Sequence, residues 1–387
     1  MKTATVTWIT YNNYGTLLQA YALQKAVQML GHENVILSDK EILKEFRASR
    51  PKNVLPKRQE PVPEPQTARL KRILKDPGRL WRMVLARKDP ERYEYPYEAS
   101  EKACDEFREE QLLVRHDVRG DALAALNEEY DAFLCGSDQI WSPRELNFNP
   151  YYYLDFAQKK KIAYGPSLGT DKIPEDKAET IKSLLQDFEG LSVREDISAE
   201  QLTELTGRDV RWVADPTLLH DKTFWTEFAS GVKQKKKKYL LCYFLENKAW
   251  YFDYARKVSQ KMGLKLLLIP NRWDYLQHSF VADFAVGPKE FVALFRDASY
   301  VLTDSYHGSI FSLIFEKQFQ YLQRFAENDV NSQNVRIQSL FGLLELEDRI
   351  IAGTARPDPT ETKYPDILQK LRIFREESRG FLADSMR

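Results

Sequence analysis

A polar run between an apolar strand and a helix is the strongest candidate in the sequence for chemistry. Residues 303–309 read TDSYHGS and follow the apolar residues 300–302. A helix that begins here presents free backbone N–H groups and a partial positive charge, so it can bind an anion. His307 can then donate a hydrogen bond or a proton to the ligand. The alternative is structural: Asp304 or Ser305 caps the helix and His307 packs beneath it.

An arginine at the end of another predicted strand is the second candidate. Residues 192–196 read SVRED, so Arg194 offers a planar fork of donors that matches a carboxylate or a phosphate. The alternative is a salt bridge to Glu195 or Asp196. Because ligands of α/β proteins bind at the carboxyl ends of strands, we expect Arg194 and His307 to hold one anionic ligand, one from each half of the chain.

A turn with hydrogen-bonding and aromatic side chains is the third candidate. Residues 136–141 read GSDQIW after a short apolar strand. Gly136 permits a tight turn, Asp138 and Gln139 can bind hydroxyl groups, and Trp141 can stack on a sugar. The alternative is an Asx turn with a packed tryptophan.

The fourth candidate, Asn12 to Gly15, lies at the first strand-to-helix turn but lacks GxGxxG, which argues against a dinucleotide site. The motifs HExxH, GxxxxGK[ST] and GxSxG are also missing from the sequence. The other histidines are isolated and are interpreted as surface or core residues: His32, His116, His220 and His278.

Alternating strands and helices must position these candidates. The first half predicts strands at 4–9, 35–37, 132–135, 161–164, 191–193 and 210–213, and helices at 18–29, 175–188 and 198–205. The second half predicts strands at 239–244, 264–269, 300–303 and 319–322, helices at 249–262, 288–296 and 307–315, and a helical tail from 365. This order is typical of parallel α/β sheets.

A run of lysines at 233–238 indicates a boundary near residues 220–238. We therefore predict an N-terminal α/β domain, 1–220, and a C-terminal α/β domain with a helical tail, 221–387. Two such Rossmann-like domains leave a cleft between them.

Residues 47–100 interrupt the α/β pattern with several prolines and are interpreted as an insertion or lid. Within them, residues 66–92 hold nine basic and three acidic residues among apolar ones. Such a segment can rest on an anionic membrane surface, although an ordinary packed helix explains the same pattern.

Composition narrows the classes of function. The formal net charge is +0, which gives no reason to expect nucleic acid as a partner. The three cysteines are far apart, which argues against a zinc knuckle, a redox dithiol or a disulfide scaffold. The sequence predicts neither a signal peptide nor a membrane span, so we expect a cytoplasmic protein, which can contact the inner face of the membrane through 66–92.

In their order and spacing, the motifs resemble the polysaccharide pyruvyl transferase family. They are residues 13–23 (NYGTLLQAYAL), 136–141, 192–195, 215–219 (DPTLL) and 303–308. The resemblance implies a GT-B-like fold and transfer of pyruvate from phosphoenolpyruvate to two hydroxyls of a sugar. It matches the family's donor arginine to Arg194 and its histidine to His307. Many members carry an arginine where this chain has Ser305, and Arg324 or Arg336 can replace that charge.

With this resemblance, roles are assigned as follows. The catalytic residues are His307 and Asp138; the donor is bound by Arg194, Ser305, Tyr306, Gly308 and Arg336; the acceptor is bound by Asn13, Tyr14, Gln139 and Trp141. No metal or cofactor is expected, and whether the saccharide acceptor is lipid-linked stays open. Two alternatives share the fold: a nucleotide-sugar glycosyltransferase and a noncatalytic saccharide-binding protein.

Overall fold

The computed structural model describes residues 1–48, 90–144, 148–234, 237–275, 278–326, 329, 332–353 and 361–387. Most of the interruption at 47–100 and of the basic segment at 66–92 lies outside these residues, so their predicted roles as a lid and as a membrane contact stay predictions. Within the described part, no helix is long and apolar enough to cross a membrane.

The first half of the chain forms a six-stranded parallel sheet with the order β3-β2-β1-β4-β5-β6. Its central strands, β1 and β4, are almost wholly buried, as expected for a parallel sheet covered on both faces. The strands are β1 (Lys2–Val6), β2 (Glu33–Leu37), β3 (Val114–Arg115), β4 (Ala132–Cys135), β5 (Lys160–Ala163) and β6 (Phe188–Gly190). Its α-helices are α1 (Tyr14–Met29), α2 (Lys40–Ala48), α6 (Glu175–Leu185) and α7 (Asp196–Thr206).

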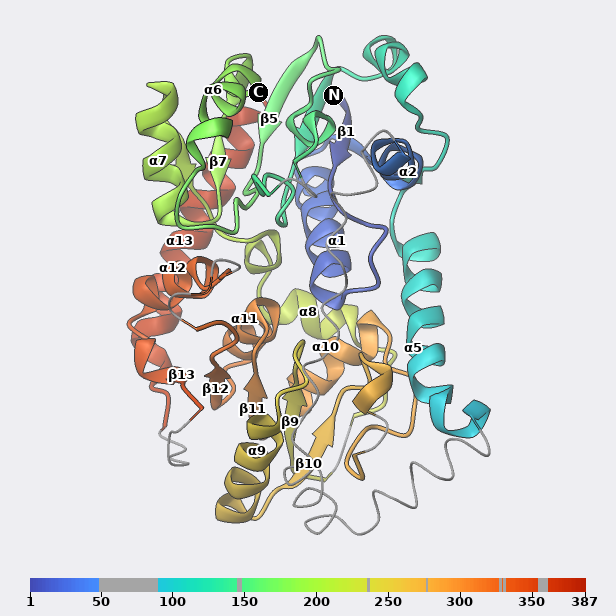
Figure 1. Ribbon diagram of the computed structural model, residues 1–387, viewed down its shortest axis with the longest axis vertical. Helices are drawn as coiled ribbons and strands as arrows, with labels where there is room; N and C mark the ends of the chain where they lie inside the picture. The colour runs from blue at the N-terminus through green and yellow to red at the C-terminus, as the bar shows by residue number, and fades with distance from the viewer. Residues whose placement is uncertain are drawn as a thin grey trace.

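The second half forms a separate five-stranded parallel sheet with the order β10-β9-β11-β12-β13. The strands are β9 (Tyr239–Tyr243), β10 (Lys265–Leu268), β11 (Tyr300–Thr303), β12 (Phe319–Leu322) and β13 (Ile350–Ile351). Its helices are α9 (Ala249–Met262), α10 (Pro288–Asp297), α11 (Tyr306–Ile314) and α12 (Val335–Leu344). Figure 1 shows the two sheets one above the other, with α1 reaching down toward α8 (Lys222–Phe228), α10 and α11.

Further elements complete the two halves and connect them. A two-stranded parallel ladder joins β7 (Ser192–Val193) to β8 (Arg211–Trp212). Helix α5 (Pro90–Gln111) contacts both α1 and α10. The halves also share one buried apolar core, in which Leu17 and Leu18 of α1 cluster with Phe291 and Phe295 of α10. The described residues also form five 3-10 helices, at 120–128, 150–153, 216–219, 273–275 and 347–349.

The strand orders determine where a ligand can bind. The first sheet has the strand order of a Rossmann fold. Strands are added toward one edge after β1 and toward the other edge from β4 onward, so the topological switch point lies between β1 and β4. In the second sheet the corresponding switch point lies between β9 and β11. Loops that follow these four strands leave a crevice at the carboxyl ends, which is where α/β sheets bind ligands.

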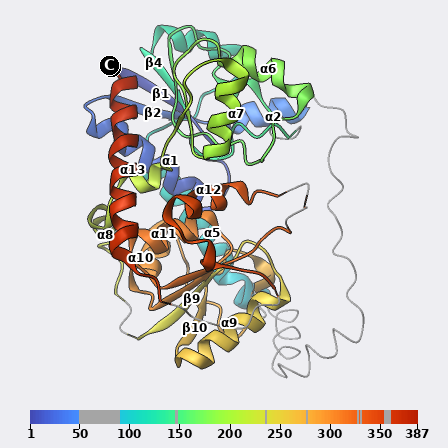
Figure 2. The same cartoon turned by 90° about the vertical axis from the view of Figure 1, so that its left-hand side faces the viewer.

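The C-terminal helix α13 (Tyr364–Ser385) packs on both halves, as Figure 2 shows. Its first turns place Leu371 and Phe374 in the core shared with the second sheet. Its last turn places Leu382, followed by Met386, in a cluster with Leu23 of α1. The tail that the sequence analysis grouped with the second domain therefore also completes the packing of the first.

Candidate functional site

A cavity of about 500 Å³ lies between the two sheets, at their facing carboxyl ends. The first half contributes the loop after β1, the start of α1 and the loop after β4; the second half contributes the loops after β9, β11 and β12 and the start of α12. Its lining residues are Trp8, Tyr11, Asn13, Thr16, Asp138, Gln139, Leu245, Ser305, Tyr306, His307, Arg324, Gln333 and Arg336. This volume is ordinary for a small-molecule site.

His307 enters the cavity from the first turn of α11. Ser305 is the N-cap of this helix, and its hydroxyl accepts a hydrogen bond from the Gly308 N–H at 3.3 Å. The His307 side chain is mostly buried, and its Nε2 lies 3.4 Å from Oδ2 of Asp215. A Cβ on Gly15 would fall 2.0 Å from His307 Nδ1, so this approach of α1 to the imidazole requires glycine.

Asp138 follows β4 in a turn with two unusual backbone angles. Gly136 has φ 122° and Asp138 has φ 66°, the left-handed region that aspartate tolerates better than most residues. Its Oδ2 accepts a hydrogen bond from the Thr16 hydroxyl at 2.6 Å. Burial alone would raise the pKa of Asp138, but Arg194, His307 and the Thr16 bond outweigh it and hold that pKa below its usual range. Asp138 is therefore a carboxylate at neutral pH.

Arg194 is wholly buried beneath the cavity and does not line it. Its Nη1 lies 2.7 Å from Asp215 Oδ2, its Nη2 lies 3.2 Å from Asp138 Oδ1, and its Nε lies 3.7 Å from Glu195 Oε1. Protein carboxylates thus already surround the guanidinium, and the direct grip of Arg194 on the donor stays a prediction. The structural alternative from the sequence, a salt bridge to Glu195, describes part of this cluster.

The charges around Arg194 determine the protonation states of the neighbouring carboxyl groups. Burial opposes ionisation of Asp215, yet His307, Arg194 and the Thr217 hydroxyl together hold its pKa well below the usual range. For Glu195 the balance is opposite: burial raises its pKa despite the nearby Arg194. Asp138 and Asp215 are therefore the two charged partners that Arg194 neutralises.

Two other arginines face the cavity, as the sequence analysis suggested for the missing charge at Ser305. Arg336 donates from Nη2 to the Gln333 side chain at 2.6 Å, while its buried Nε has no hydrogen-bond partner among the described residues. Burial, with Arg194 and Arg324 nearby, lowers the pKa of Arg336 to about 10. Arg324 pairs with Glu246 at 3.1 Å. A bound anion would relieve the repulsion among these cations.

The ring of Tyr306 contacts two of the guanidinium groups. Arg194 lies 5.0 Å from the ring centroid and Arg336 lies 5.8 Å from it. The electron-rich face of a tyrosine attracts a cation, so it stabilises two like charges that would otherwise repel. Tyr306 also lines the cavity, as predicted for a donor-binding residue.

The structure places two of the predicted acceptor residues in the core. Trp141 is buried, stacks on Tyr153 at 5.1 Å and donates its indole N–H to the Tyr152 carbonyl. Tyr14 is also buried, and its hydroxyl donates to the Val286 carbonyl at 2.7 Å. Neither residue lines the cavity, because both aromatic rings fill the core instead.

Of the other assigned residues, two line the cavity and one supports the packing of the helix beside it. Asn13 and Gln139 line the cavity, although the side-chain Oδ1 of Asn13 also caps α1 by accepting from the Thr16 N–H at 3.3 Å. Gly308 is buried, and a Cβ there would lie 2.3 Å from the Thr303 hydroxyl, so it allows α11 to pack against β11.

Sequence reasoning missed Trp8, Tyr11, Thr16, Gln333 and the supporting Asp215. Trp8 was included in the strand predicted at 4–9, but β1 ends at Val6 and Trp8 belongs to the loop. The available signal for Asp215 is an acidic residue before a proline after a predicted strand, within the motif 215–219 to which the sequence analysis gives no role.

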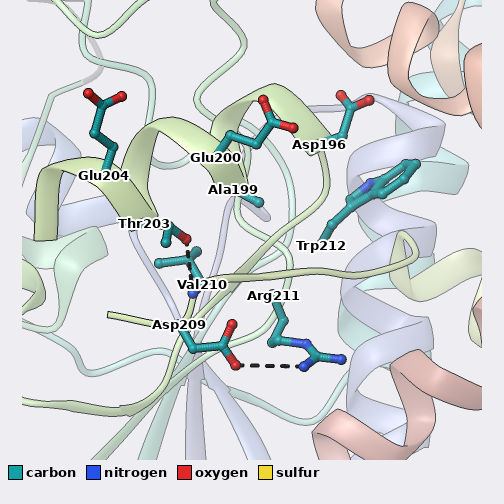
Figure 3. Close-up of a pocket in the computed structure, with 9 residues that line it drawn as sticks. All are labelled: Asp196, Ala199, Glu200, Thr203, Glu204, Asp209, Val210, Arg211 and Trp212. Carbon is teal, nitrogen blue, oxygen red and sulfur yellow. Dashed lines mark hydrogen bonds and ion pairs between the residues drawn. The ribbon is translucent and has the colours of Figure 1, made fainter. Parts of the chain in front are cut away.

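Figure 3 shows a second hollow, at the edge formed by α7 and β8, with Asp196, Glu200 and Glu204 carried on the helix. Asp209 adds a fourth carboxylate, 3.6 Å from Arg211. This negative lining disfavours an anionic ligand. Among the described residues, no group of His, Cys, Asp or Glu side chains is arranged to hold a metal ion.

Two Rossmann-like units whose topological switch points face one cavity define a GT-B-like α/β protein. The chain belongs to the polysaccharide pyruvyl transferase family, whose model matches residues 13–322. No curated protein matches the chain.

Solved structures similar to this chain share little sequence with it. Escherichia coli heptosyltransferase WaaC with ADP is 13% identical with a TM-score of 0.40, covering 98% of this chain and 100% of that one. A putative UDP-N-acetylglucosamine 2-epimerase from Listeria monocytogenes is 9% identical with a TM-score of 0.48, covering 99% and 91%. The S. aureus MnaA–UDP co-structure is 12% identical with a TM-score of 0.46, covering 100% and 91%.

Proposed function

We propose that this protein transfers pyruvate from phosphoenolpyruvate to two hydroxyl groups of a saccharide and forms a cyclic ketal. One observation carries the proposal: a histidine, two arginines and a helix N-terminus meet a carboxylate in one cavity between the two halves. The family supports a transferase that modifies a polysaccharide, and the cavity chemistry supports the donor.

Phosphoenolpyruvate has two anionic groups, and the second-half wall of the cavity offers two kinds of anion-binding group. Arg336 and Arg324 can pair with one or both anions through charged hydrogen bonds. The first turn of α11, which begins at Tyr306, adds the backbone N–H groups of Tyr306 and His307 and the positive end of the helix dipole. In this proposal the donor lies against the second half.

His307 supplies the proton that starts the reaction. Protonation of the donor's methylene carbon gives a methyl group and leaves a cationic carbon that bears the phosphate oxygen. One sugar hydroxyl adds to this carbon and loses its proton; the carbon–oxygen bond to phosphate then breaks, and the second hydroxyl closes the ketal. One hydroxyl proton replaces the proton given by His307, and the other leaves with phosphate. No metal or cofactor is needed in this scheme.

Asp138 is proposed to receive the hydroxyl proton. Its pKa is held below the usual range, which makes it a weak base. A weak base suffices here, because a hydroxyl that has added to a cationic carbon becomes strongly acidic. The low pKa also keeps Asp138 ionised and ready to accept a hydrogen bond from the hydroxyl.

The test combines phosphoenolpyruvate with free and lipid-linked saccharides and follows phosphate release together with the ketal methyl signal by NMR. We expect both products only when donor and acceptor are present. Turnover of UDP- or ADP-sugars without use of phosphoenolpyruvate would instead assign a glycosyltransferase. Saccharide binding with neither reaction would assign a binding protein.

A further inference from the structure

We propose that Trp8 and Tyr11, in the loop between β1 and α1, form the platform on which the acceptor sugar ring stacks. The inference rests on the proposed function for the identity of the acceptor, but the binding site itself is argued from the cavity. It replaces the buried Trp141 as the aromatic contact.

The cavity has two chemically different walls. The second-half wall has the cations Arg324 and Arg336 and suits an anion. The first-half wall carries the aromatic rings of Trp8 and Tyr11, the side-chain amides of its turn residues and one carboxylate, Asp138. Aromatic faces bind the apolar C–H face of a sugar, while amides and carboxylates bind its hydroxyls, so this wall fits an uncharged pyranose.

Both aromatic rings remain accessible although they adjoin the core. Tyr11 is 39% exposed, which is high for a tyrosine ring at the rim of a buried cavity. Trp8 is half-buried, with part of its indole packed on the core of the first half. The two rings meet edge to face, with centroids 5.5 Å apart. Their remaining surface is available to a ligand at the cavity.

Hydrogen bonds hold the loop in place from outside the cavity. Arg108 of α5 donates from Nε to the Ile9 carbonyl at 2.6 Å and from Nη2 to the Asn12 side chain at 2.5 Å. The Thr10 hydroxyl donates to Asp39. Asp39 also accepts from the hydroxyl of Tyr152, whose ring packs edge-on against Trp8 at 6.3 Å. A platform fixed before binding loses little conformational entropy when the sugar arrives.

Trp8 and Tyr11 line the same cavity as Asp138. With Asp138 opposite the donor wall, a sugar stacked on Trp8 presents its hydroxyls toward the site of proton transfer.

The experiment measures binding of methyl hexopyranosides of glucose, galactose, mannose and N-acetylhexosamines by saturation-transfer NMR and titration, without phosphoenolpyruvate. We expect Trp8→Ala to weaken binding of the preferred sugar by about tenfold or more, and Tyr11→Ala by roughly threefold to tenfold. Trp8→Phe should keep part of the affinity. Trp250→Ala, which removes a half-buried tryptophan from α9 outside the cavity, is the matched control and should change nothing.

Phosphoenolpyruvate binding is measured on the same variants by calorimetry and should remain within about twofold of the unchanged protein. The platform is refuted if Trp8→Ala binds the sugar normally, if it weakens the donor as strongly as the sugar, or if no panel sugar binds the unchanged protein. Because these titrations need no turnover, a protein that binds sugars through Trp8 but leaves phosphoenolpyruvate untouched would support the platform and reject the proposed function.

Discussion

The two oxygens of the Asp215 carboxylate have separate partners. Oδ1 accepts from the Thr217 N–H at 3.0 Å and from the Thr217 hydroxyl at 2.6 Å. Oδ2 faces Arg194 at 2.7 Å and His307 Nε2 at 3.4 Å. One oxygen thus shapes the turn, while the other orients the imidazole in the proposed site. A carboxylate in this place acts through His307, so it is a positioning residue.

We predict that Asp215→Asn lowers kcat by about 10²-fold or more while phosphoenolpyruvate still binds, since an amide N–H aimed at His307 imposes the wrong tautomer. Steady-state kinetics and donor titration measure the two effects. Thr217→Val removes only a hydrogen bond to Oδ1 and should keep most of the turnover. Normal turnover by Asp215→Asn would show that the carboxylate merely holds the turn.

Arg194 and Arg336 should respond in opposite ways to loss of charge. Arg336→Gln should weaken phosphoenolpyruvate binding by roughly tenfold to a hundredfold, the effect of a lost charged hydrogen bond, with no loss of stability. Arg194→Met leaves Asp138 and Asp215 without their buried cation, so we expect the free energy of unfolding to fall by about 3–5 kcal/mol. Calorimetry and urea denaturation separate the two results. A stable Arg194→Met protein that fails only to bind the donor would restore Arg194 as a ligand.

At the scale of elements, the start of α1 presses against the start of α11. We predict that Gly15→Ala displaces His307 and lowers turnover by about 10²-fold, because the added methyl would overlap the imidazole. The matched control is Gly380→Ala in α13, where an added Cβ meets nothing within 4 Å. That control should keep full activity and gain about 0.5–1 kcal/mol of stability in the helix. Equal activity of both variants would contradict the contact.

The Asp304 carboxyl group, at the end of β11, accepts hydrogen bonds from backbone N–H groups of the loop after β9. Its contribution to the free energy of unfolding should depend on pH. Burial raises its pKa from 3.8 to about 6, against the opposing effect of the Leu245 and Glu246 N–H groups. Between these values the folded chain holds more protons than the unfolded chain, so the contribution of Asp304 to stability falls as pH rises through this window.

Comparison with Asp304→Asn isolates this effect, because asparagine does not titrate. Unfolding in urea at intervals from pH 4 to pH 7 should show the unchanged protein losing stability relative to the variant, by about 3 kcal/mol in total. A difference between the two proteins that stays constant across this range would show that Asp304 does not bind a proton in the folded state.

Local patterns predicted many elements well. Helix α9 (Ala249–Met262) and strands β4, β11 and β12 have the predicted bounds, because compact apolar runs and flanking polar residues define them within the sequence itself. Helices α2 and α12 were not predicted. Helix α12 is short and has no side-chain cap, so neither a cap nor a long periodic stripe marked it.

The site was less accessible to sequence reasoning than the elements. Position after a strand correctly indicated Asp138 and His307 as cavity residues. The same argument failed for Arg194 and Trp141, because tertiary packing decides whether a side chain faces the cavity or the core. For Arg194, two carboxylates from distant segments, Asp138 and Asp215, join the neighbouring Glu195 around the guanidinium, and only the folded chain brings them there.

At the scale of the whole molecule, α13 makes the stability of one half depend on the other. Leu382, 1% exposed near the end of this helix, packs on the first half, so we expect Leu382→Ala to lower the free energy of unfolding by about 2–5 kcal/mol. Leu368→Ala on the same helix, at a position 38% exposed, should stay within about 0.5 kcal/mol. Urea denaturation followed by circular dichroism tests both. Equal stability of the two variants would mean that the last turns of α13 contribute little.

The packing of α13 on the first half also determines when that half can complete its core during translation. The ribosome makes β1, α1 and β4 early, but Leu382 and Met386, which cover Leu23 and Val27 of α1, are made long after them. During that interval an apolar stripe of the nascent chain stays open to water, and exposed surface of this kind attracts chaperones and promotes aggregation. We therefore expect the first half to be most prone to aggregation until nearly the whole chain has been translated.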